Sequence, residues 1–240
     1  MAISATAIDA DAGRASSWPS VAVAQSSPVA RRSATAIQYA LAKRALDVVV
    51  AATLLLLLLP LFVVIALAIV LDSGGPIFYC AERVGRYGRP FCVAKFRSMR
   101  AGCDQAAHAA FVRTLMKGET SCSVYKVADD RRVTRVGSFL RRTSLDELPQ
   151  LWNVLRGEMS LVGPRPDVPY AVAEYADWVH ARLNVLPGIT GLWQVSGRSR
   201  VSLLEMYRLD VAYAAQASLR ADLRILLRTV PVVLGRDGAA

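Results

Sequence analysis

The stretch VVVAATLLLLLLPLFVVIALAIVL, residues 48–71, contains 24 consecutive residues without a charged side chain, and Asp47 and Asp72 bracket it. Only Thr53 and Pro60 within it are not apolar. A straight helix of this length reaches roughly 36 Å, which is enough to cross the roughly 30 Å hydrocarbon core of a bilayer. The stretch therefore predicts a membrane segment, and its simplest form is a single transmembrane helix.

Two features favour a bent segment instead. Pro60 stands at the midpoint, where it removes a backbone hydrogen bond and clashes with the preceding turn, so we expect a kink there. Basic residues also flank both ends: Arg31, Arg32, Lys43 and Arg44 come before the stretch, and Arg83, Arg86 and Arg89 come after it. The positive-inside rule then selects no orientation, whereas a re-entrant segment keeps both flanks on the cytoplasmic face. The sequence favours the re-entrant topology and leaves the spanning one open.

The composition agrees with a membrane-associated protein that meets anions. Apolar residues make up 54% of the 240 residues, and 29 Lys and Arg against 19 Asp and Glu give a formal charge of +10. Such values exclude disordered, collagen-like and disulfide-scaffold proteins. Nearly all the basic residues are arginine, whose planar guanidinium suits phosphate. A nucleic-acid binder would fit the charge, but no binding motif is present, so we expect no nucleic-acid partner.

The cysteines do not indicate a metal site or a disulfide framework. The four cysteines are Cys80, Cys92, Cys103 and Cys122, and no two of them have the CxxC spacing. Only His108 and His180 are available to complete a metal site. In a chain without a secretory signal this pattern predicts reduced, cytosol-facing thiols.

The rest of the chain predicts an α+β fold that is mostly helical. Residues 1–36 indicate a disordered tail and residues 37–72 a membrane anchor. Within residues 73–240 we expect a small domain with a short β-ribbon and amphipathic helices. The ribbon joins residues 76–79 to 91–96 across Gly85–Gly88; helices are predicted over 104–117, 144–156 and 217–230; and loops are predicted over 119–130, 160–167 and 187–199.

The last predicted helix has two distinct faces. One is apolar and carries Leu219, Leu223, Leu226 and Val230, and the other carries Arg220, Arg224 and Arg228. Such a pattern is typical of a helix lying at a membrane interface, and equally of a packed helix with a solvated basic face. The sequence leaves both interpretations open.

The densest group of ionisable residues is RRTSLDELPQ, residues 141–150. Ser144 with Glu147 three residues later spells a capping box, although Pro149 makes Asp146 an alternative cap. Either placement puts acidic side chains at the positive end of a helix, close to Arg141. Both effects favour an ionised carboxylate at Asp146.

Two stiff loops follow this acidic pair. Arg165 stands between Pro164 and Pro166, and a second loop reads PGITGLWQVSGR over residues 187–198. A backbone restricted in this way suits a phosphate clamp, although the same triplet also forms an ordinary rigid turn. No Walker sequence, G-x-G-x-x-G or Asp-x-Asp occurs, so the usual nucleotide-binding folds are not supported.

With these blocks in view, the chain resembles the bacterial sugar transferases, the monotopic phosphoglycosyl transferases that start polysaccharide assembly on a polyprenyl phosphate. The matching blocks are Lys43-Arg44 with Asp47, residues 82–85, residues 95–99, residues 145–155, residues 159–166 and residues 187–198. Together they cover everything after the tail. In such a protein, residues 37–72 are a re-entrant anchor broken at Pro60 and residues 73–240 a cytoplasmic catalytic domain.

The resemblance implies a specific reaction at the inner membrane of a bacterium. A hexose-1-phosphate, from UDP-galactose or UDP-glucose, passes to undecaprenyl phosphate with release of UMP, as the first membrane step of exopolysaccharide synthesis. Asp146 is the expected nucleophile, and it would carry a covalent phosphosugar. Asp146 and Glu147 are the expected carboxylates for Mg²⁺, Arg141 lies nearby, and Pro164, Arg165 and Pro166 contact the nucleotide. The resemblance does not choose the hexose, the oligomeric state or which carboxylate binds the metal.

Two other classes of protein remain as alternatives. A single-span membrane protein with a basic cytoplasmic interaction domain and no catalysis fits the charge and the hydropathy. It gives no reason for the pattern from Asp146 to Arg198. An ordinary glycosyltransferase would release UDP rather than UMP, so the released nucleotide distinguishes the two enzymes.

Overall fold

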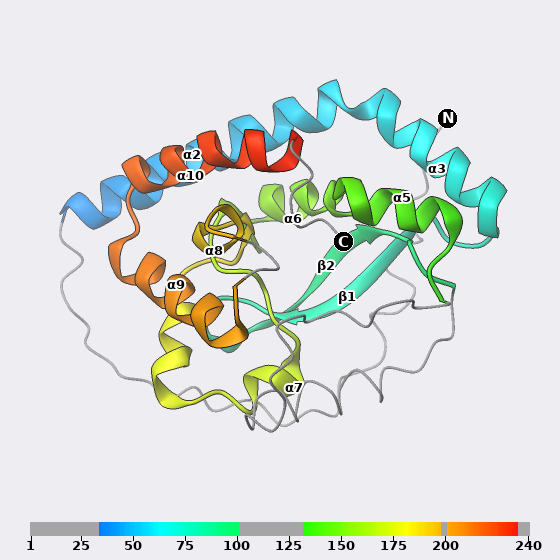
Figure 1. Cartoon of the computed structure of the whole chain (residues 1–240). Coiled ribbons are helices and arrows are strands. Elements are labelled where there is room, and N and C mark those ends of the chain that lie inside the picture. The colour runs from blue at the N-terminus through cyan, green and yellow to red at the C-terminus, as the bar shows by residue number, and fades with distance from the viewer. Residues whose placement is uncertain (1–33, 101–131, 198–200, 235–240) are drawn as a thin grey trace.

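The computed structural model describes residues 34–100, 132–197 and 201–234, and these ranges form a mostly helical α+β fold with two small sheets (Figure 1). The helices are α2 (Ala34–Leu57), α3 (Leu59–Ser73), α5 (Arg135–Thr143), α6 (Gln150–Arg156), α7 (Pro169–Val172), α8 (Leu192–Val195), α9 (Leu203–Gln216) and α10 (Leu219–Leu234). The 3-10 helices are η1 (Arg86–Gly88), η2 (Leu145–Glu147) and η3 (Asp177–Asn184), and the strands are β1 (Phe78–Val84), β2 (Pro90–Phe96), β3 (Ser160–Val162) and β4 (Gly188–Thr190).

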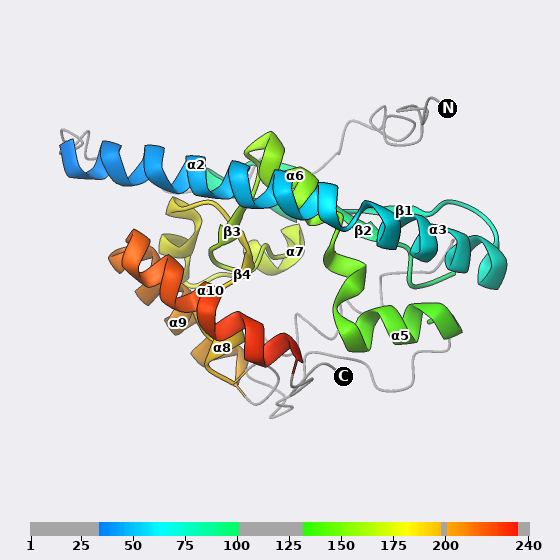
Figure 2. The same cartoon turned by 90° about the horizontal axis from the view of Figure 1, so that it is seen from above.

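The apolar stretch folds as two helices that meet at a sharp bend. No single helix in the described ranges is long and apolar enough to cross a bilayer; by length and composition alone, α2 and α3 together, bent by 60°, fit either a broken span or a re-entrant loop. Pro60 lies in the first turn of α3, where its missing N–H leaves no bond unmade. The predicted kink is confirmed. Figures 1 and 2 show α2 and α3 running along one side of the molecule.

The predicted ribbon is confirmed as an antiparallel pair, β1 with β2, in which Ala81 faces Val93. Its cysteines contradict the expectation of four reduced thiols, because a disulfide joins Cys80 and Cys92. The Cα atoms of the two residues lie 5.4 Å apart on the adjacent strands. Spacing along the sequence gave no sign of this, since the hairpin alone brings them together. Cys103 and Cys122 lie outside the described residues, as do the predicted helix 104–117 and loop 119–130.

The two glycine-bearing segments are more ordered than predicted. Residues 160–167 and 187–199 were expected to be loops, but β3 and β4 pair in parallel, with Ser160 opposite Gly188. The backbones come so close that a Cβ on Gly163 or Gly188 would overlap the backbone of the other segment. Three-residue strands built around such contacts carry no alternating pattern, which explains the wrong prediction.

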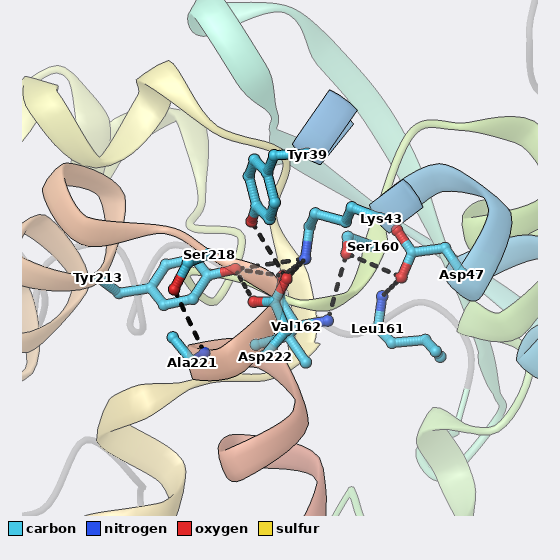
Figure 3. Close-up of polar contacts among 10 residues, drawn as sticks. All are labelled: Tyr39, Lys43, Asp47, Ser160, Leu161, Val162, Tyr213, Ser218, Ala221 and Asp222. Carbon is cyan, nitrogen blue, oxygen red and sulfur yellow. Dashed lines mark hydrogen bonds and ion pairs between the residues drawn. The ribbon is translucent and has the colours of Figure 1, made fainter. Parts of the chain in front are cut away.

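Helix α2 is fixed to the domain by buried polar contacts (Figure 3). Lys43 Nζ donates to Asp222 Oδ2 of α10 at 2.9 Å and to the carbonyl of Val162 in β3 at 3.0 Å. Asp47 Oδ1 accepts bonds from the Ser160 hydroxyl and the Leu161 N–H, at 3.1 and 3.0 Å. These contacts tie the first described helix to both the last helix and the strand that leads into the Pro164–Pro166 loop.

Arg44 makes a second connection from α2. Its guanidinium donates to the carbonyls of Val154 and Leu155 at 2.6 and 2.7 Å, where α6 ends at Gly157. The last carbonyls of a helix lack intrahelical partners and carry partial negative charge, so a cation there is favourable. Arg44 therefore fixes the end of α6, whose beginning follows directly on Asp146 and Glu147.

Candidate active site

The acidic pair lies on η2, a short helix between α5 and α6. Ser144 has φ 57° and ψ 16° and ends α5, and its side chain makes no capping bond. The predicted capping box is therefore wrong, and so is the alternative cap at Asp146, because Pro149 precedes α6. Instead of one helix over 144–156, the chain turns at Ser144 and again at Pro149. This arrangement directs the acidic pair toward β2 and the Pro164–Pro166 loop.

Glu147 is held between two cations. Lys95 Nζ of β2 donates to its Oε1 at 2.9 Å, and Arg165 donates to Oε1 at 2.7 Å and to Oε2 at 3.4 Å. Burial would raise the pKa of Glu147, but the charges of Arg165 and Lys95 outweigh it and lower the pKa well below its usual range. Glu147 is thus ionised at any physiological pH, and it fixes the position of both cations.

Asp146 differs from its neighbour because its carboxylate accepts no hydrogen bond within the described part of the chain. Its nearest cation is Lys95, with Nζ 4.0 Å from Oδ2. Burial raises the pKa of Asp146, an effect that Lys95 partly opposes. The expectation that helix capping stabilises the ionised form is therefore wrong. A carboxylate that is poorly solvated and not hydrogen-bonded keeps its lone pairs available for reaction.

Lys95, Asp146, Glu147 and Arg165 will be called the carboxylate cluster. Lys95 was not predicted as a site residue, although it belongs to residues 95–99, one of the blocks that resemble the family. Its place in the site becomes evident only in the fold, where β2 packs against η2. Arg141 is at the edge of the cluster. Its guanidinium donates to Ser98 Oγ at 3.2 Å and to Met99 Sδ at 3.7 Å, and it makes no ion pair with either carboxylate among the described residues.

A second group of polar side chains contacts the backbone of the Pro164–Pro166 loop, and it will be called the Arg182 cluster. It consists of Asp167, Tyr175, Arg182, Tyr207 and Asp210. Arg182 is 2% exposed, and it donates to Asp210 Oδ2 at 2.5 Å and to the carbonyl of Arg165 at 2.7 Å. Sequence analysis missed this cluster, since its members are spread over more than forty residues and match no motif.

Asp167 completes the support of the loop. Its Oδ2 accepts bonds from the hydroxyls of Tyr175 and Tyr207 at 3.0 and 2.9 Å, and its Oδ1 accepts from the Val168 N–H at 2.8 Å. Its own carbonyl accepts from the N–H of Val84 in β1 at 2.9 Å. Asp167 is thus held by its side chain and by its backbone carbonyl. This limits the movement of the preceding loop, and therefore the positions that the Arg165 side chain can reach.

The donor set at the acidic pair suits Mg²⁺. Within residues 34–100, 132–197 and 201–234, no group of three or more His, Cys, Asp and Glu side chains is placed to hold a metal by itself. Mg²⁺, however, is usually bound through one or two carboxylates together with substrate phosphates and water. Asp146 offers two oxygens without hydrogen bonds, and Glu147 lies next to it, so the residues present fit that pattern.

Comparison with known proteins now identifies the family. The family model described as bacterial sugar transferase matches residues 38–236. The chain belongs to the bacterial sugar transferases. This confirms the resemblance found in the sequence, and the match covers most of α2, all of α3, both clusters and α10.

Curated bacterial sugar transferases are similar over most of the chain. A UDP-galactose-lipid carrier transferase of Erwinia amylovora is 46% identical over 197 residues, which are 82% of this chain and 41% of that protein. A UDP-glucose:undecaprenyl-phosphate glucose-1-phosphate transferase of Caulobacter vibrioides is 44% identical over 211 residues, 83% of this chain and 72% of that protein. The exopolysaccharide production protein ExoY of Rhizobium meliloti is 42% identical over 193 residues, 80% and 85% of the two chains.

The relatives differ in length. This chain spans about two fifths of the Erwinia protein and of the galactosyl transferase CpsE of Streptococcus agalactiae, with 41% and 43% of those proteins covered. It spans most of ExoY. More than half of each of the two longer relatives therefore lies outside the part that this chain matches.

Proposed function

We propose that this protein transfers a hexose-1-phosphate from a UDP-hexose to undecaprenyl phosphate, with release of UMP, as the first membrane step of exopolysaccharide synthesis. The observation that carries the proposal is the carboxylate of Asp146, which has no hydrogen bond within the described ranges and lies beside two cations that Glu147 fixes. The names of the relatives support the substrates, because they include galactose and glucose transferases that act on undecaprenyl phosphate.

The first step forms a covalent intermediate on Asp146. A carboxylate oxygen attacks the β-phosphorus of the UDP-hexose, and the bond from that phosphorus to the oxygen bridging the two phosphates breaks. UMP leaves with the bonding electron pair, and the hexose phosphate remains on Asp146 as an acyl phosphate. Arg165 and Lys95 lie where they can bind the phosphate oxygens, and so reduce the repulsion between two anions.

The second step transfers the hexose phosphate. An oxygen of undecaprenyl phosphate attacks the same phosphorus, the bond to Asp146 breaks, and the carboxylate is regenerated together with a diphosphate-linked hexose. In both steps Glu147 holds Lys95 and Arg165 in position. The Arg182 cluster holds the backbone of the Pro164–Pro166 loop, which we propose contacts the uridine nucleotide.

Mg²⁺ is the proposed cofactor, held by Asp146, Glu147 or both. When bound, it would neutralise charge on the diphosphate of the donor. Arg141, at the edge of the carboxylate cluster, adds positive charge on the same side. The chain's own cations remain responsible for the orientation of the phosphates.

The anchor places this chemistry at the membrane. We propose that α2 and α3 form a re-entrant segment bent at Pro60, and that residues 73–240 lie on the cytoplasmic face of the bacterial inner membrane. The 60° bend supports this topology, and so do the basic residues on both flanks. The phosphate of undecaprenyl phosphate lies at the interface, so the carboxylate cluster would meet it at headgroup height.

Identification of the released nucleotide tests the proposal. The full chain, purified in detergent, is incubated with Mg²⁺, undecaprenyl phosphate and either UDP-galactose or UDP-glucose, and the products are separated by chromatography. We expect UMP together with a lipid-linked hexose diphosphate. Release of UDP would indicate an ordinary glycosyltransferase, and no release with either donor would favour the non-catalytic membrane protein.

A further inference from the structure

Helix α10 presents three different faces. Asp222 and Ile225 turn inward and are 1% and 3% exposed. Leu223, Leu227 and Val230 form an apolar ridge that faces outward, with exposures of 50%, 75% and 57%. The third face carries Arg220, Arg224 and Arg228, one turn apart. The predicted arginine face is confirmed. The predicted apolar face is divided, because Leu226 packs against the core and Leu219 is half-buried, whereas Leu223 and Val230 are exposed.

The arginine face borders a groove of about 440 Å³ between α8, α9 and α10. The three arginines line it together with Leu192, Tyr213, Ile225 and several small or polar residues, and no acidic side chain does. Within the described residues none of the three guanidinium groups has an ion pair or a hydrogen bond. Asp222, the nearest acid in sequence, is already bound to Lys43, Tyr39 and Tyr213.

Three unpaired guanidinium groups along one groove are suited to an anionic ligand. Each can donate two parallel hydrogen bonds to phosphate oxygens, and a ligand in the groove meets no competing carboxylate. The groove lies away from the carboxylate cluster in sequence and is built from other elements. Neither cluster described above uses these arginines.

The apolar ridge indicates which anion the groove takes. On a helix with about 100° per residue, Leu223 and Leu227 stand directly beside the arginine row. The beginning of α10 contacts α2 through Asp222 and Lys43, and Figure 2 shows α10 diverging from α2 after that point. Helix α3, which continues α2, also exposes large apolar side chains. A ligand that fits both features has a phosphate headgroup next to hydrocarbon.

We propose that the groove between α8, α9 and α10 binds the phosphate headgroup of an anionic membrane phospholipid. The arginines hold the phosphate, and the ridge of Leu223, Leu227 and Val230 lies against the acyl chains. The inference is independent of the sugar transfer proposed above, because its readout is lipid binding and not turnover.

The probe is a short-chain phosphatidylglycerol kept below its micelle concentration, titrated calorimetrically into the full chain in a neutral detergent. Phosphatidylcholine of the same chain length and inorganic phosphate serve as ligand controls. We expect saturable binding of phosphatidylglycerol, with at least about tenfold weaker binding of either control. Equal affinity for inorganic phosphate would overturn the proposal, because the groove would then be a site for a free anion.

Two variants test the groove, and one controls for net charge. We expect R220Q/R224Q/R228Q to weaken phosphatidylglycerol binding at least about tenfold. The matched control R86Q/R135Q/R208Q removes three exposed arginines elsewhere and should bind as the wild type does. If both triple variants lose the same affinity for phosphatidylglycerol, net charge alone explains the binding, and the proposal is overturned.

Ala212→Phe keeps every arginine and fills the groove from the exposed side of α9. It should also weaken binding, which keeps the test decisive if the triple variant fails to fold. Normal binding by this variant would show that the groove is not the site. All measurements are repeated in the Asp146→Asn background, where binding should persist even if no sugar transfer is ever observed.

Discussion

The carboxylate cluster and the Arg182 cluster are both built from buried acids and arginines, yet they differ in what they leave unbonded. In the carboxylate cluster, Glu147 binds both cations, and Asp146 accepts no hydrogen bond from any residue that the structure describes. In the Arg182 cluster, Asp167 accepts bonds on both oxygens, and Arg182 donates from both terminal nitrogens. Among the described residues, one cluster leaves the whole carboxylate of Asp146 without a hydrogen bond, whereas the other leaves only Asp210 Oδ1 without one and uses its acids to fix an arginine.

The two clusters meet at Arg165. Its guanidinium belongs to the carboxylate cluster, whereas its backbone carbonyl accepts a bond from Arg182. A substitution in the first cluster should therefore affect chemistry and spare stability. A substitution in the second should affect stability first, and then substrate binding through the position of Arg165.

The largest expected effect is that of Asp146→Asn. Loss of the nucleophile should lower the rate of UMP release at least about a thousandfold, since such residues contribute most of the rate of covalent catalysis. The melting temperature should stay within about 2 °C, because no described hydrogen bond is lost. Asp177→Asn, on an exposed position of η3, is the matched control. Wild-type turnover by Asp146→Asn would disprove the assignment of the nucleophile.

Arg182→Met should have the largest effect on stability. It leaves Asp167 and Asp210 buried without their cation, which costs about 3–5 kcal/mol in the free energy of unfolding. Chemical denaturation measures the loss. If the folded variant is active, its KM for the UDP-hexose should rise more than its kcat falls, because Arg182 acts through Arg165. A stable variant with an unchanged KM would contradict a supporting role.

Lys43→Met tests whether the contact between α2 and α10 contributes as much to the free energy of unfolding as the Arg182 cluster does. Asp222 keeps its bond from Tyr213, so we expect a smaller loss of about 1–3 kcal/mol. Thermal unfolding in detergent measures it, with Arg156→Met on the surface as a control. A loss as large as that of Arg182→Met would mean that the two contacts are energetically alike.

Lys95→Met removes a cation of the carboxylate cluster and should lower activity, and the smallest expected effect is its shift of the pH dependence. Burial raises the pKa of Asp146 and Lys95 opposes that effect, so removal of Lys95 raises this pKa further. Asp146 must be ionised to attack, so activity falls as pH drops through this pKa. The acidic limb of the kcat/KM profile should therefore move to higher pH in the variant. An unmoved or lower limb would show that another group controls it.

Features that depend on local sequence were predicted well. Pro60 in an uncharged stretch specified the bend between α2 and α3, and the apolar runs around Gly85–Gly88 specified the ribbon. The acidic pair at residues 146–147 and Arg165 were chosen as candidates from their neighbours in sequence, and the structure places Glu147 and Arg165, 18 positions apart, in one ion pair. In each case the prediction rested on residues that are close to one another in sequence.

Features that depend on distant contacts were missed or wrong. The parallel pairing of β3 with β4 needs glycines that let two backbones touch, which resembles a loop when only the sequence is known. The left-handed conformation of Ser144 breaks the predicted helix. Arg182 and its partners, and the disulfide between Cys80 and Cys92, exist only because the fold brings separate segments together.

The bond between Lys43 and Asp222 has a consequence for the order of events during synthesis. Its two residues are 179 positions apart, so at about 5–20 residues per second the ribosome makes the second roughly 9 to 36 s after the first. The whole apolar stretch is complete long before Asp222 exists. The partners of Arg44 and Asp47 are made earlier than Asp222, so the contact of α2 with α10 is the last of these contacts that can form.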